Sequence, residues 1–63
     1  MMFKANELVL LKRDILVAPT GETIARGSKA TVKKIKGDTV YLRIGVLQFY
    51  ETAIWLGSFN RDL

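Results

Sequence analysis

Cysteine and histidine are both missing from this sequence. Without cysteine there are no disulfide bonds to stabilise the fold, and without either residue a conventional Cys/His zinc site cannot form. A Ser-His-Asp triad is excluded too, because its general base is a histidine. The fold must therefore be stabilised by packing or by self-association, and we expect no metal site.

Long apolar runs are absent as well. No segment approaches the roughly 18 apolar residues that a membrane-spanning helix requires. Residues 1–7 lack the apolar core and the small-residue cleavage site of a secretory signal. The 63 residues suffice for one small domain over residues 1–63. We therefore expect a single cytoplasmic domain that makes no contact with membranes.

Paired catalytic groups are also missing. The acidic residues are scattered, so no spacing indicates the two facing carboxylates that glycoside hydrolysis requires. Residues 26–29, Arg-Gly-Ser-Lys, do not have the spacing of either glycine-rich phosphate-binding fingerprint. We therefore predict a protein that is not an enzyme and that needs no cofactor. An enzymatic site would have to be built jointly by the subunits of an oligomer.

The clearest pattern that is present lies in residues 30–44, where two alternating segments flank Gly37 and Asp38. In the second segment, apolar residues alternate with Thr39, Tyr41 and Arg43, as they do in a half-buried strand. Gly-Asp suits a two-residue hairpin loop, because glycine adopts positive φ without a steric penalty from Cβ. The pattern predicts a central β-hairpin.

Regular pairing of this hairpin leads to a conflict. Counting outward from the turn sets Lys33 opposite Leu42, which places a charge on the apolar face. A β-bulge in which Lys33 and Lys34 together oppose Tyr41 removes the conflict, because it returns Val32 to the apolar face. We therefore predict a bulge at these two lysines.

The apolar residues 8–11 predict the first strand, with Val9 and Leu11 facing inward. Leu8 and Leu10 then face outward, where either the N-terminal Phe3 or the chain end covers them, or they form a contact surface. The rest of the chain predicts, in order, an irregular hairpin (15–17 and 23–25), a strand (47–51), a 3₁₀ turn (52–55) and a short last strand (56–59). A competing interpretation makes residues 48–56 an amphipathic helix.

Residues 24–35, Ile-Ala-Arg-Gly-Ser-Lys-Ala-Thr-Val-Lys-Lys-Ile, resemble the KOW-type pattern of a glycine-bearing turn, a small residue, a valine and a basic-hydrophobic exit. Residues 6–9 resemble the usual opening of the same domains. The predicted order of a strand, an irregular hairpin, a strand pair, another strand, a 3₁₀ turn and a short last strand is similar to that of SH3-like barrels. The chain thus resembles the SH3-like barrel superfamily, which includes small KOW- and Tudor-like barrels. The resemblance implies an all-β fold, namely a single small five-stranded, partly open barrel with one 3₁₀ turn near the C-terminus. It also implies a binding module whose ligand the fold does not name.

Positive charge is concentrated on the central hairpin. Residues 26–43 hold six Lys or Arg residues and one acid, whereas the rest of the chain holds four cations and five acids. Cations contact phosphates and a tyrosine stacks on bases, so we predict a nucleic-acid-binding face formed by Lys29, Lys33, Lys34, Lys36, Tyr41 and Arg43. The simpler interpretation is a solvated strand face whose lysines prevent edge pairing.

A second function class is a protein-interaction module, meaning a small subunit, an adaptor or an inhibitor. Its predicted contact residues are Leu8, Leu10, Tyr50 and Trp55, with an acidic or peptide-bearing protein, or a second copy of the chain, as the partner. Two interpretations remain for the aromatic residues: Tyr50 and Trp55 line a groove beside the irregular hairpin, or Trp55 closes the bottom of the core.

Overall fold

The computed structural model describes residues 3–17 and 20–59, and this part of the chain is all-β. Its elements are β1 (Leu8–Leu11), β2 (Ile15–Val17), β3 (Glu22–Ile24), β4 (Lys29–Lys36), β5 (Thr39–Ile44), β6 (Leu47–Thr52), the 3₁₀ turn η1 (Ala53–Trp55) and β7 (Leu56–Ser58). The all-β prediction is confirmed. The alternative helix over residues 48–56 is wrong, because β6 and η1 occupy these positions.

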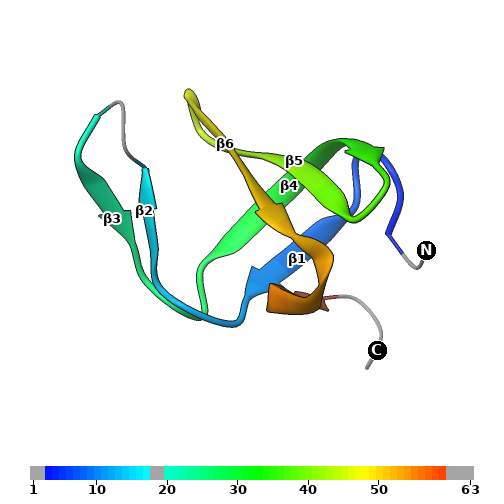
Figure 1. The fold of residues 1–63 in the computed structure, drawn as a ribbon, viewed down its shortest axis with the longest axis horizontal. Coiled ribbons are helices and arrows are strands. Elements are labelled where there is room, and N and C mark those ends of the chain that lie inside the picture. The colour runs from blue at the N-terminus through cyan, green and yellow to red at the C-terminus, as the bar shows by residue number, and fades with distance from the viewer. Residues whose placement is uncertain (1–2, 18–19, 60–63) are drawn as a thin grey trace.

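Five of the strands form one antiparallel sheet in the order β6-β5-β4-β1-β7, and β2 and β3 form a separate hairpin. In Figure 1 this hairpin extends away from the five-stranded sheet. The edge strands β6 and β7 are not paired with each other, so the sheet does not close into a barrel. Within the described residues, no helix has the length and apolar character needed to span a membrane.

The central hairpin has the predicted turn and the predicted bulge. Lys34 pairs with Tyr41, and the next pair joins Val32 to Leu42, so Lys33 is the extra residue. The turn places Gly37 at a φ of 62°, in the left-handed region that glycine adopts without strain. The apolar face of β4 therefore stays continuous across the bulge.

The core is one cluster of buried apolar residues, most of which belong to the five-stranded sheet. Val9 and Leu11 are buried, which confirms the inward positions predicted for β1, and Phe3, Leu47 and Phe49 pack against the core from its margins. The buried apolar residues are Val9, Leu11, Ile15, Val17, Ile24, Ala30, Val32, Val40, Leu42 and Leu56. Both sheets contribute to this set, so the hairpin is held in place by shared apolar packing.

Backbone bonds close the base of the β2–β3 hairpin. The Leu11 N–H donates to the Ser28 carbonyl at 2.9 Å, and the Gly27 N–H donates to the Leu11 carbonyl at 2.8 Å. The Arg26 N–H donates to Oδ1 of Asp14 at 2.8 Å. The chain therefore leaves and rejoins the main sheet at one point, which determines where the hairpin lies relative to β6.

Candidate functional site

Pairing across β4, β5 and β6 brings three predicted site residues into one row on the outer side of the sheet. Lys34 pairs with Tyr41, and Tyr41 pairs with Tyr50. Arg43 lies in the next row, opposite Gln48. We call the set Lys34, Lys36, Tyr41, Arg43 and Tyr50 the basic face.

The two tyrosines of the basic face are in contact. Their ring centroids are 5.9 Å apart and their planes are inclined by 53°. Nζ of Lys34 lies 5.1 Å from the centroid of the Tyr41 ring. Tyr50 is 66% exposed, so most of its side chain is open to a ligand. The arrangement sets two aromatic rings beside a cation, as stacking on a base and pairing with its phosphate require.

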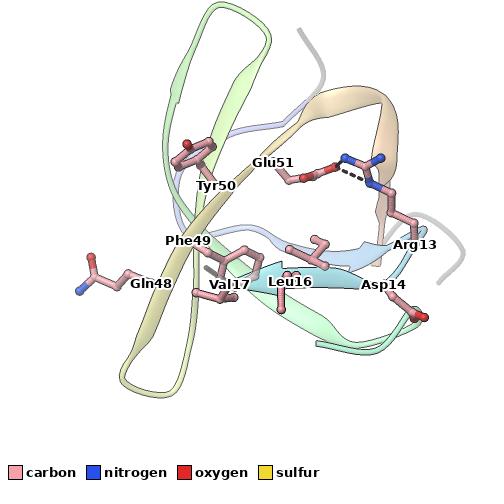
Figure 2. Close-up of a pocket in the computed structure, with 9 residues that line it drawn as sticks. Arg13, Asp14, Leu16, Val17, Gln48, Phe49, Tyr50 and Glu51 are labelled. Atoms are coloured by element: carbon pink, nitrogen blue, oxygen red, sulfur yellow. Dashed lines mark hydrogen bonds and ion pairs between the residues drawn. The ribbon is translucent and has the colours of Figure 1, made fainter. Parts of the chain in front are cut away.

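The basic face carries no carboxylate. Glu51 is the one acid in β4, β5 and β6, and only 7% of the residue is exposed. In Figure 2, Glu51 points to the side of β6 opposite Tyr50. Asp38 lies in the turn beyond the end of the strands. The potential over this face is therefore positive, with no acid among its side chains to neutralise it.

The remaining predicted cations are placed differently. Lys33 is the bulged residue and is exposed. Lys29 lies at the far end of β4, opposite Leu10, and its Nζ lies 4.9 Å from the centroid of the Phe59 ring. The structure thus places three of the five predicted cations on the basic face, Lys33 at the bulge beside it and Lys29 apart from it.

The residues predicted for protein binding do not form one surface. Leu8 and Leu10 are half-buried on β1, where they pair with Thr31 and Lys29. Tyr50 lies on the basic face in β6, which β5 and β4 separate from β1 in the sheet. Trp55 lies in η1, with the Arg13 guanidinium 4.5 Å from its ring centroid.

Arg13 and Glu51 form an ion pair that the sequence did not reveal. Nη2 and Nε of Arg13 lie 2.6 and 2.9 Å from Oε2 of Glu51, whose side chain is only 8% exposed. Arg13 follows β1 and Glu51 lies in β6, so the pair joins the start of the hairpin segment to the edge of the main sheet. Together with Trp55 beneath the guanidinium, it forms the clasp, defined as Arg13, Glu51 and Trp55.

A groove of about 560 Å³ separates β2 from β6 and is drawn in Figure 2. Phe49 points toward β2, whereas Gln48 and Tyr50 point to the other side of β6. Leu16, at the rim on β2, is 67% exposed. The groove is lined by Arg13, Asp14, Ile15, Leu16, Val17, Gln48, Phe49, Tyr50 and Glu51. The sequence predicted a groove beside the irregular hairpin lined by Tyr50 and Trp55; Tyr50 lines this groove and Trp55 does not. The prediction missed Leu16, Gln48 and Phe49.

One signal in the sequence could have predicted that Tyr41 lies opposite Tyr50. Gly45 and Val46 form a two-residue loop, with Ile44 opposite Leu47. Counting outward from that loop sets Tyr41 opposite Tyr50. No such count leads to the clasp or to the groove, because both depend on how the hairpin folds back. Within the described residues, no three Asp or Glu side chains gather in a way that could hold a metal ion.

Comparison with models of protein families, with curated proteins and with solved structures found no match to this chain.

Proposed function

We propose that this protein is a non-enzymatic binding module of SH3-like fold that binds nucleic acid through the basic face. The observation that carries the proposal is the row Lys34, Tyr41 and Tyr50, flanked by Arg43, on a sheet face without a carboxylate. An exposed tyrosine stacks only on a base that is itself unstacked. The expected ligand is therefore single-stranded, and recognition is mainly electrostatic with little sequence preference.

The order of the strands supports the SH3-like part of the proposal. The sheet runs β7-β1-β4-β5-β6, a hairpin lies between β1 and β4, and η1 lies between β6 and β7. This is the element order on which the resemblance to SH3-like barrels rests. The bulge at Lys33 adds the local twist that curved small sheets need.

The cations define a salt dependence. Lys33, Lys34, Lys36 and Arg43 are all exposed. If each neutralises one phosphate, the logarithm of the affinity for a single strand falls with log salt at a slope of about −3. Stacking on Tyr41 and Tyr50 adds about 1–3 kcal/mol per base and depends little on salt. The two contributions can therefore be measured separately.

The test is titration with a short oligothymidylate and with a duplex at low and moderate salt, followed by amide chemical shifts. Shifts are expected in β4, β5 and β6, with tighter binding of the single strand. Tyr50→Ala should weaken binding about tenfold without changing the salt slope. Arg43→Ala should reduce the slope by about 0.7.

Lys12→Ala is the matched control for the loss of one charge. The Lys12 side chain lies beside Gly57 in β7, at the opposite edge of the sheet from β6. This variant should bind like the unmodified protein. The proposal is wrong if no binding is detected, or if shifts are confined to residues 14–17 and 48–51 around the groove. It is also wrong if Lys12→Ala and Arg43→Ala weaken binding equally.

The alternative, a protein-interaction module built from Leu8, Leu10, Tyr50 and Trp55, has less support. These side chains belong to β1, β6 and η1 and are not gathered on one surface. Of these four residues, Tyr50 alone also lines the groove between β2 and β6.

A further inference from the structure

β6 has an edge without a partner among the described strands. One side of β6 pairs with β5, and the sheet ends there. Ile44 opposes Leu47 across a two-residue loop, so these two residues exchange backbone hydrogen bonds. Counting by twos along an antiparallel pair, the backbone N–H and C=O groups of Gln48 and Tyr50 point away from β5. Within the described residues, no backbone bond outside the ladder with β5 uses these groups.

The groove lies along this same edge. Its far wall is β2, which belongs to the other sheet and is not paired with β6. Phe49 and the buried Val17 give the groove an apolar interior. An added strand at the β6 edge would set alternate side chains into this interior and the others beside Gln48 and Tyr50.

The positive charge of this sheet face determines which outer side chains of an added strand would be favoured. Beside Gln48 and Tyr50, the next strand carries Arg43, and Lys34 lies one strand further on. No carboxylate lies on this face of the three strands. The cations act from across β6, so their positive field favours acidic side chains on the outer row of an added strand and disfavours basic ones.

A second copy of the chain is disfavoured as the occupant by the same charges. Antiparallel pairing of two β6 edges would continue one sheet, with both basic faces on the same side. Both β6 strands would lie between the Arg43 residues of the two copies, but each copy carries a net charge of +4. Two copies with the same net charge repel each other, which opposes this pairing.

We propose that the β6 edge captures an extended peptide segment of alternating apolar and acidic residues, as an added strand in the groove between β2 and β6. The backbone groups of Gln48 and Tyr50 hold its main chain, and Phe49 and Val17 contact its apolar side chains. Arg43, on β5, attracts its acids from across β6. The proposal does not depend on nucleic-acid binding, because the main-chain contacts lie on the edge and not on the face.

The first experiment uses a capped synthetic peptide of about nine residues that alternates glutamate and valine. Saturating peptide should slow hydrogen exchange of the Gln48 and Tyr50 amides at least about tenfold. The Phe49 amide, which already pairs with β5, should change little. A lysine–valine peptide of the same length should bind at least about tenfold more weakly.

N-methylation of the peptide tests the strand geometry directly. Methyl groups on every second nitrogen in one register should abolish binding, because those N–H groups pair with β6. Methyl groups in the other register should leave binding nearly unchanged. Equal effects of the two registers would overturn strand addition, and so would bound peptide without protection of Gln48 and Tyr50.

A matched pair of protein variants supplies an independent check. Gln48→Pro removes an N–H that the fold itself does not use, whereas Gln48→Ala retains it. Gln48→Pro should weaken peptide binding about tenfold and Gln48→Ala hardly at all. Equal affinities would overturn the proposal. So would protection of Gln48 and Tyr50 without peptide at concentrations where sedimentation detects a dimer.

Discussion

Replacing Arg13 with alanine tests whether the clasp holds the hairpin to the main sheet. The change leaves the Glu51 carboxylate, 8% exposed, without the partner that lies 2.6 Å away. Breaking a fully buried pair costs about 3–5 kcal/mol, and an exposed pair contributes about 0–1 kcal/mol. The Arg13 side chain is 48% exposed, so solvent screens part of the interaction. We expect a loss of about 2 kcal/mol, between these limits.

A loss of this size is large for a chain of 63 residues. Its total stability is expected at about 3–9 kcal/mol, and a loss of about 2 kcal/mol lowers Tm by about 8–16 °C. Urea and thermal unfolding can be followed by the fluorescence of Trp55, the one tryptophan, which lies under the Arg13 guanidinium. The emission spectrum of the folded variant should also change, because the guanidinium has left the ring.

Two further variants make this prediction refutable. Arg26→Ala is the matched control, because the contact of Arg26 with Asp14 uses its backbone N–H and survives the change. It should cost no more than about 0.5 kcal/mol. Glu51→Gln should destabilise the unmodified protein but partly restore stability to Arg13→Ala, because it removes the unpaired buried charge. Equal losses for Arg13→Ala and Arg26→Ala, or the same effect of Glu51→Gln in both backgrounds, would refute the reasoning.

Three other changes test the fold. Leu42→Ala, at a residue 1% exposed, should cost about 2–5 kcal/mol in urea unfolding, whereas Leu16→Ala, at a residue 67% exposed, should cost under about 0.5 kcal/mol; equal losses would contradict the core assignment. Gly37→Ala should cost about 1 kcal/mol in thermal unfolding and Gly37→Asn less, because φ is 62° and nothing within 4 Å meets an added Cβ; identical melting of the two would argue against backbone strain. Deleting Lys33, the bulged residue, should preserve the folded amide spectrum, whereas deleting Thr31 should not, since only the first deletion keeps every side chain on its face; the reverse order would contradict the bulge.

The central hairpin and its bulge could be predicted because they depend on neighbouring residues. Gly37 allows a two-residue loop, and the loop determines which residues face each other. Once the faces are known, a charge beside Leu42 cannot be accommodated, so the extra residue must be at Lys33. The inward positions of Val9 and Leu11 follow from the same alternation.

The candidate site was predictable only in part. Lys34, Tyr41 and Arg43 lie on the central hairpin and share the face expected from their spacing. Tyr50 lies beside Tyr41 because Gly45 and Val46 form a two-residue loop. Counting residues outward from that loop predicts this pairing from the sequence. Lys29 follows the same alternation, yet its Nζ lies beside the ring of Phe59, which follows the edge strand β7. No local pattern predicts this contact.

The sequence by itself determined the all-β character, the central hairpin with its bulged lysine and the concentration of positive charge, because alternation, turn chemistry and charge count are properties of short segments. Only the tertiary structure decided that Arg13 meets Glu51, 38 residues away, and that β2 stands across a groove from the open edge of β6. These contacts arise when the β2–β3 hairpin shares the core with the main sheet. That packing depends on the volumes and shapes of residues far apart in the chain, which no local pattern encodes.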